Sequence, residues 1–95
     1  MNDPNLLILT SLADGDKHGY AMMEDIQHFS GVSLGPGTLY GAITRLEERG
    51  WIRPTRSTDR RQPYTLTAAG KRHLSEQLES LNRFVAQGRL RLEQA

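Results

Sequence analysis

The sequence predicts a mainly helical α+β fold that contains one small β-hairpin. Residues 36–49 have helical periodicity, and two short strand-like runs, 51–53 and 64–67, follow at once. A third observation is the heptad pattern of apolar residues across 74–92, which is typical of a long helix that packs against another helix. Together these features predict short helices, then a hairpin, then a long final helix.

Length and composition limit the chain to one small domain. It has 95 residues, of which 37% are apolar, so its own core is marginal and a second copy is expected to complete it. The absence of cysteine excludes disulfides, thiolate metal sites and a cysteine nucleophile. Residues 1–4 lack the basic segment of a signal peptide, and the apolar run 6–9 is too short to cross a membrane. We therefore expect a cytoplasmic protein without a membrane partner.

Two helices are expected before residue 32. The first covers residues 5–13, and its apolar positions are Leu6, Leu7, Ile8, Leu9 and Leu12. The second is predicted from Lys17 or His18 to Phe29. Asp16 is its expected N-cap, and Gly31 is the residue expected to end it. The apolar positions of this second helix are Met22, Met23, Ile26 and Phe29.

The third helix is predicted to begin at Pro36, which suits the first helical position, and to end before Gly50. At about 100° per residue its apolar side chains share one face; they are Leu39, Ala42, Ile43 and Leu46. The opposite face is small and hydrogen-bonding, which suits close approach to base edges and phosphates. It comprises Gly37, Thr38, Gly41, Thr44 and Arg45, with Tyr40 at its edge. The glycines indicate close contact, either with DNA or with another helix.

The hairpin follows Gly50 directly. Arg53-Pro54 predicts an edge strand, because proline has no N–H to donate to an inner ladder. Residues 57–59 have turn chemistry, and 64–66 form the returning strand. A further short strand over 32–34 fits the pattern. Thr67 is expected to cap the last helix, with Gly70 in its first turn.

The last helix is predicted from Ala68 to about Glu93. Its heptad seam, with one glycine gap, comprises Leu74, Leu78, Leu81, Val85, Gly88 and Leu92. A helix that projects from so small a domain cannot bury this seam alone. Part of the seam is expected on the first helix of the same protomer and the rest against a second subunit, although a purely intramolecular face remains an alternative.

Charge is distributed unevenly along the chain, although its net charge is only +1. Residues 1–50 carry three basic and seven acidic side chains, whereas 51–73 carry six basic side chains and one acidic side chain. The positive charge therefore falls on the hairpin, where it is either a phosphate-binding patch or a solvated loop. A helix followed by a basic hairpin favours the first interpretation, because such a pair can contact a DNA groove and the neighbouring phosphates.

Other functional classes have little support in the sequence. His18, His28 and His73 are far apart, and none has the i, i+4 spacing of a metal site. A metal site that joins His28 or His73 to Glu24 or Glu76 is the alternative that remains. The serines lack a nucleophile elbow, and no glycine-rich phosphate loop follows a strand. We therefore expect no enzyme activity, no catalytic residue, no metal and no cofactor.

Four motifs together resemble the PadR family of transcriptional regulators: His-Gly-Tyr at 18–20, Pro-Gly-Thr-Leu-Tyr at 36–40, Arg-Leu-Glu-Glu-Arg-Gly-Trp-Ile at 45–52 and Tyr-Thr-Leu-Thr-Ala-Ala-Gly at 64–70. The resemblance covers residues 6 to about 81. It implies a winged helix-turn-helix repressor that binds a palindromic operator as a homodimer through its C-terminal helix. Many such regulators respond to a small aromatic or lipophilic effector. The single C-terminal helix is similar to the shorter branch of the family.

By position, the resemblance makes 1–67 a winged-helix DNA-binding domain and 68–95 a dimerisation helix of the same compact unit. Residues 36–50 become the recognition helix and 53–63 the wing. The residues expected to contact double-stranded DNA are His18, Tyr20, Pro36, Gly37, Thr38, Tyr40, Gly41, Thr44, Arg45, Arg53, Arg56, Arg60 and Arg61. Those expected at the dimer interface are Leu6, Leu9, Leu74, Leu78, Leu81, Phe84, Val85 and Leu92.

The sequence departs from the family pattern at two positions, and it leaves two rival functions open. Gly35 stands where a serine N-cap is frequent, and Gly41 stands where a proline commonly follows the tyrosine. One rival function is a protein-interaction module of the same fold that does not bind DNA. The other is a protein that sequesters a ligand in its dimer pore.

Overall fold

The computed structural model describes residues 3–57 and 59–95, so expectations that concern Met1, Asn2 and Thr58 lie outside the described residues. Within this part, four helices and a small antiparallel sheet confirm the predicted fold class. In chain order the elements are α1 (Pro4–Leu12), β1 (Lys17–His18), α2 (Gly19–Ser30), α3 (Pro36–Glu48), β2 (Ile52–Pro54), β3 (Pro63–Leu66) and α4 (Ala68–Gln94).

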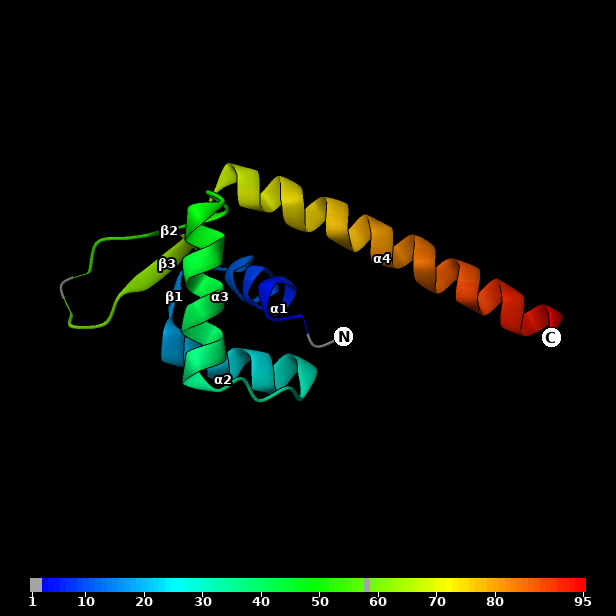
Figure 1. Cartoon of the computed structure of the whole chain (residues 1–95), viewed down its shortest axis with the longest axis horizontal. Coiled ribbons are helices and arrows are strands. Elements are labelled where there is room, and N and C mark those ends of the chain that lie inside the picture. Colours follow the sequence, from blue (N-terminus) through cyan, green and yellow to red (C-terminus); the bar gives the residue numbers. More distant parts are fainter. Residues whose placement is uncertain (1–2, 58) are drawn as a thin grey trace.

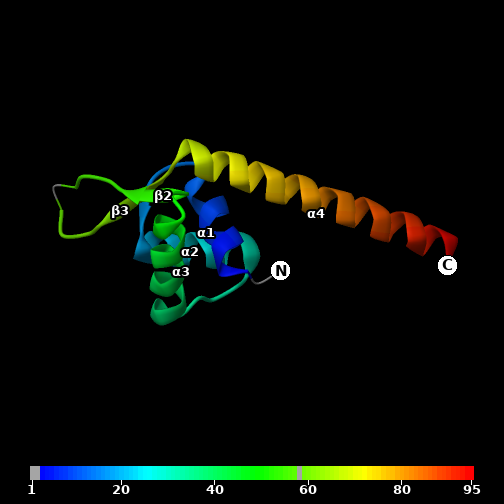
Figure 2. The same cartoon turned by 45° about the horizontal axis from the view of Figure 1, so that its top comes forward.

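The elements are arranged so that the hairpin and α4 leave the helical cluster in opposite directions (Figures 1 and 2). Helices α1, α2 and α3 pack together, and α3 lies between the base of the hairpin and α1 (Figure 1). The molecule is elongated, with extents of 56 × 26 × 20 Å. Its two projecting elements are therefore free to contact different partners.

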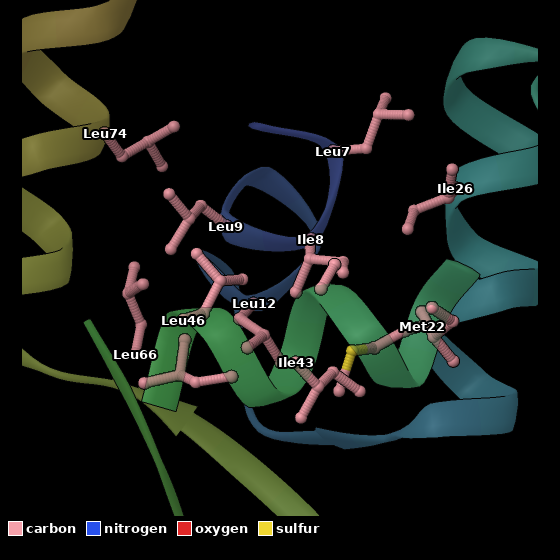
Figure 3. Close-up of a cluster of buried hydrophobic side chains, with 13 residues drawn as sticks. Leu7, Ile8, Leu9, Leu12, Met22, Ile26, Ile43, Leu46, Leu66 and Leu74 are labelled. Atoms are coloured by element: carbon pink, nitrogen blue, oxygen red, sulfur yellow. The ribbon is translucent and has the colours of Figure 1, made fainter. Parts of the chain in front are cut away.

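The core is built around the apolar face of α3, whose four predicted members are all buried, at 0–2% exposure. Figure 3 shows Ile43 and Leu46 of α3 in the middle of the cluster, with Met22 and Ile26 of α2 at one end and Leu66 and Leu74 at the other. Helix α1 is buried on several sides, and its core residues are Leu7, Ile8, Leu9 and Leu12. It is therefore the central helix of the domain.

Helix α2 begins later than the sequence suggested, and its predicted cap is wrong. The helix starts at Gly19, and the N-cap is His18, whose Nδ1 accepts a hydrogen bond of 3.3 Å from the backbone N–H of Ala21. The end of the helix is as predicted, because Gly31 adopts the left-handed conformation with φ 75°. Phe29, which was expected on its buried face, is 44% exposed because it lies in the last turn, at the edge of the core.

The sheet has the strand order β1-β3-β2. Strand β2 lies at an edge, as the proline at position 54 predicts, and Arg53 faces Thr65 in the register. The third strand is not 32–34, which is irregular, but β1, in which Lys17 pairs with Tyr64. This long-range pairing explains why residues 17–18 are extended rather than helical.

A polar network connects the end of α1 to β1 and α2. Ser11, which is 1% exposed, donates a hydrogen bond of 2.6 Å to Asp25. The Lys17 ammonium group donates to the Ser11 carbonyl oxygen and to Asp14, and this hydrogen bond holds the pKa of Asp14 below its ordinary value. The network satisfies the buried hydroxyl and fixes the chain just before α2.

The first turn of α4 is attached to the segment that joins α3 to β2. Thr67 caps α4 as predicted, by accepting from the Gly70 N–H, and its own N–H donates to the Trp51 carbonyl at 3.0 Å. The Trp51 and His73 rings are stacked with their centroids 3.6 Å apart, and the Arg49 guanidinium lies 5.1 Å from the indole centroid. Helix α4 is therefore fixed to the end of α3 and to the base of the hairpin.

Gly70 is the residue that permits this close attachment. A Cβ atom at this position would lie 2.0 Å from the Trp51 carbonyl oxygen, whereas a Cβ at Gly88, on the same helix, would meet nothing within 4 Å. We expect Gly70→Ala to lower the free energy of unfolding by about 1–3 kcal/mol, because a rigid backbone atom must move. The measurement is chemical unfolding followed by circular dichroism at one protein concentration.

Gly88→Ala is the matched control and should raise the stability of α4 by about 0.5–1 kcal/mol, because alanine is the better helix former. Equal effects of the two substitutions would contradict the close contact at Gly70.

Candidate nucleic-acid interface

The outward face of α3 is exposed from its first residue. Pro36, Gly37, Thr38, Thr44 and Arg45 are all exposed, and Gly41 is half-buried. The N-cap, Gly35, provides no side-chain hydrogen bond, so the first backbone N–H groups of α3 are left for another acceptor. This end of the helix therefore favours an anion or a base edge that accepts hydrogen bonds.

Two side chains on this face have defined positions. The Thr44 hydroxyl donates to the Tyr40 carbonyl oxygen at 3.0 Å, so it has only acceptor capacity left for a ligand. A Cβ atom at Gly41 would lie 3.6 Å from Nη1 of Arg45, which is ordinary contact. The Arg45 guanidinium thus lies along the helix beside Gly41, and this position does not itself require glycine.

Tyr40 lies away from Arg45, across the beginning of α2. It is 49% exposed, and a Cβ atom added at Gly19 would lie 2.4 Å from its hydroxyl oxygen. Glycine at position 19 is therefore what lets the Tyr40 side chain occupy this place. The contact joins α3 to the start of α2.

The described residues of the wing include exposed arginines. Its base is closed by the Thr55 N–H, which donates to the Pro63 carbonyl at 3.0 Å, and by the Gln62 amide, which donates to the Thr55 carbonyl at 2.8 Å. Asp59 accepts from the Arg61 backbone N–H at 3.0 Å. The exposed guanidinium groups of the hairpin belong to Arg53, Arg56, Arg60 and Arg61. In the part of the chain that the structure describes, both ion pairs are made by Lys17, so none of these arginines is paired with a carboxylate there.

The wing returns to the start of α2, where Nη1 of Arg61 lies 3.3 Å from Nε2 of His18. His18 is half-buried and Tyr20 is 62% exposed. The structure thus brings together His18, Tyr20, Tyr40, Arg60 and Arg61 among the predicted residues, while Arg45 lies apart from them. Sequence reasoning did not identify Gly19 and Gln62 as members of this group. The His-Gly-Tyr motif was the available signal for Gly19, and Gln62 had none.

A second surface lies on α4. From Ser75 onward every residue of this helix is at least partly exposed, and Leu78, Phe84, Val85 and Leu92 are 47–77% exposed. Leu9 and Leu74, which were expected at a dimer interface, are 1% and 6% exposed. They belong to the protomer's own core and have almost no surface to offer a partner, which corrects that expectation. Leu6 and Leu81 are half-buried.

An open groove of about 650 Å³ runs beside α4. The residues that line it are Ala13, Leu66, Lys71, Leu74, Ser75, Leu78, Glu79, Leu81, Asn82 and Val85. Most of these side chains are apolar, so the groove suits an apolar side chain or a small apolar compound.

Within residues 3–57 and 59–95 the structure contains no group of three or more His, Asp or Glu side chains that could hold a metal ion. His28 lies near the end of α2 and His73 lies against Trp51 on α4. None of the helices described is long and apolar enough to span a membrane.

The chain is similar to known proteins over most of its length. Residues 8–76 match the family model of the transcriptional regulator PadR-like family. An uncharacterized 37.1 kDa protein in transposon TN4556 of Streptomyces fradiae is 45% identical over 82 residues, which are 86% of this chain but only 24% of that protein. The chain thus spans about a quarter of the length of this relative.

Solved structures agree with the family match. A PadR family transcription regulator from Clostridium difficile R20291 superposes with a TM-score of 0.79 at 28% identity, over 88% of this chain and 91% of that one. F93 from STIV, a winged-helix DNA-binding protein, has a TM-score of 0.81 at 21% identity, over 90% and 94% of the two chains, and shows the fold alone. The family comprises transcriptional regulators rather than enzymes, which confirms the expected absence of catalysis. The chain belongs to the PadR-like family of transcriptional regulators.

Proposed function

We propose that this regulator binds DNA sequence-specifically as a homodimer, on a palindromic operator, and acts as a repressor. The observation that carries the proposal is the position of the exposed face of α3 beside the arginine-bearing wing, with α4 projecting to the opposite side (Figure 1). In this arrangement α3 enters the major groove, and the wing contacts the adjacent phosphates. The repressor role and the palindrome are supported by family membership.

Dimerisation through α4 is supported by its length and by its exposed apolar residues. The helix has 27 residues, so it is about 40 Å long, and a monomer buries only its first turns. Both halves of the helix carry charges of both signs, so the apolar seam rather than the charge pattern is the argument for pairing. Pairing of two copies about a two-fold axis along this helix places two α3 helices on two half-sites, about 10 bp apart.

A small aromatic or lipophilic effector is part of the proposal. The groove beside α4, at about 650 Å³, is within the usual size range of small-molecule sites. Because it borders the proposed dimer surface, an apolar compound there would alter the pairing of the two copies and hence the spacing of the α3 helices.

The test of the whole proposal is selection of bound duplexes from a random pool. The expected product is a palindrome with a fixed half-site spacing. Failure to bind any duplex, even in low salt, would instead favour the rival function of a protein-interaction module.

The wing arginines are proposed to bind phosphates without sequence preference. Replacement of both Arg60 and Arg61 by alanine should therefore weaken binding to operator and random duplex alike, by about tenfold or more. The slope of log affinity against log salt concentration should fall in magnitude by about 2, because two phosphate contacts are lost. An unchanged slope, measured by fluorescence anisotropy over a salt series, would remove the wing from the interface.

Arg45 is proposed to contact base edges. Arg45→Ala should lower the preference for operator over random duplex by about 1–3 kcal/mol, because a base contact discriminates between sequences whereas a phosphate contact does not. The two affinities are measured side by side, and the wing double variant provides the contrast. If Arg45→Ala lowered both affinities equally, its role would be that of a phosphate ligand.

The dimer surface can be tested with two single charges on α4. Val85→Glu places a carboxylate in the apolar seam and should raise the dimer dissociation constant by about tenfold or more. Gln87→Glu adds the same charge about 160° away around the helix and should leave the dimer dissociation constant unchanged. Sedimentation equilibrium measures the dissociation constants of the two variants, and circular dichroism confirms that each is folded. Equal behaviour of the two variants would exclude this face as the interface.

A further inference from the structure

A pocket of about 380 Å³ lies between the start of α2, the Tyr40 side chain and the wing. It is lined by His18, Gly19, Tyr20, Tyr40, Arg60, Arg61 and Gln62. These residues come from three separate segments of the chain, and among those described none that lines the pocket is acidic. The lining consists mainly of hydrogen-bond donors and two guanidinium groups.

Two donors of this pocket, on His18 and Arg61, face one another. A neutral imidazole has one N–H and one lone pair. Because Nδ1 of His18 caps α2 by accepting from the Ala21 N–H at 3.3 Å, we assign the proton of the neutral ring to Nε2. Nη1 of Arg61, which can only donate, lies 3.3 Å from that same Nε2. With this tautomer both side chains present an N–H group to the same space, where one acceptor can bind the two donors together.

No carboxylate among the described residues lines this space. The nearest acidic residue along the wing, Asp59, accepts from the backbone N–H of Arg61 at 3.0 Å and does not line the pocket. The Gln62 amide nitrogen donates to the carbonyl oxygens of Thr55 and Pro63. Two arginines and a half-buried histidine thus enclose a space that a compact anion with several acceptor oxygens would fill.

We propose that this pocket binds a single phosphate, to which Nε2–H of His18 and the Arg61 guanidinium donate together. The ligand is the phosphodiester of a DNA backbone, and an inorganic phosphate or phosphate monoester offers the same oxygens. The assignment of the ligand to a DNA backbone phosphate rests on the proposed function. A phosphate held here connects the wing to the start of α2, and Tyr40, which packs on Gly19, places this connection beside α3.

The test uses variants that remove a donor of the pocket, one of which keeps the side-chain cap of α2. His18→Asn retains a side-chain acceptor for the N-terminus of α2 but cannot extend a donor to the position of Nε2. Arg61→Ala removes the second donor. Arg56→Ala is the matched control, because it removes the same charge from the wing and does not line the pocket. Circular dichroism confirms that each variant is folded.

In the first measurement each variant binds a 20-bp duplex of random sequence at low salt. His18→Asn and Arg61→Ala should each weaken binding about tenfold. Their double variant should bind scarcely more weakly than either single variant, rather than by the product of the two effects, because two donors on one phosphate act together. Strictly multiplicative effects, or a loss no greater than that of Arg56→Ala, would overturn the shared phosphate and leave the proposed function intact.

The second measurement does not depend on DNA. Inorganic phosphate is added at constant ionic strength while the ¹⁵N signals of the His18 imidazole are followed by NMR. The expected result is a saturable shift at Nε2 that Arg61→Ala abolishes and Arg56→Ala retains. A protein that shows this shift but binds no duplex would retain the phosphate pocket and refute the proposed function. If neither phosphate nor duplex perturbs Nε2, the pocket assignment is wrong.

Discussion

The burial of one face of α3 is the constraint on which the rest of the structure depends. Leu39, Ile43 and Leu46 are at most 2% exposed, and each such side chain contributes about 1.5–3 kcal/mol when it leaves water. Because these residues fix the rotation of α3 about its axis, they also decide that Thr38, Thr44 and Arg45 face outward. The position of the candidate interface is thus a consequence of packing on the other side of the same helix. The proposed contacts with bases need no further element to orient them.

The attachment of α4 is the second determinant of the architecture. Its first turn contacts the Trp51 backbone so closely that only glycine fits at position 70, and the His73 ring stacks on Trp51 from the next turn. The direction of the whole helix is set within these few residues, since the following turns have little contact with the domain. Any force on the exposed end of α4 therefore acts on the segment that joins α3 to the wing. This is a physical route by which pairing of two copies can position both interfaces.

Much of this fold could be predicted from the sequence, because its main signals are local. The proline and glycine that flank α3, its apolar periodicity and the edge proline at position 54 each act within a few residues, and each prediction is confirmed. The start of α2 could not be predicted, because the extended conformation at 17–18 results from pairing with Tyr64 and Pro63, far along the chain. For the same reason the candidate residues His18 and Arg61 could be named singly, but not their contact across 43 positions. Leu9 was misassigned because α1 is apolar on more than one side, and only the packed structure shows which side remains exposed.

The stacked ring at the base of the hairpin has a practical consequence. Trp51 is the only tryptophan of the chain, and it lies where α3, the hairpin and α4 meet. The tryptophan fluorescence of the unmodified molecule therefore comes from this one junction, and its emission wavelength and intensity depend on whether the His73 imidazole remains stacked on the indole. Any compound or second copy that tilts the long helix can be detected optically, without a label.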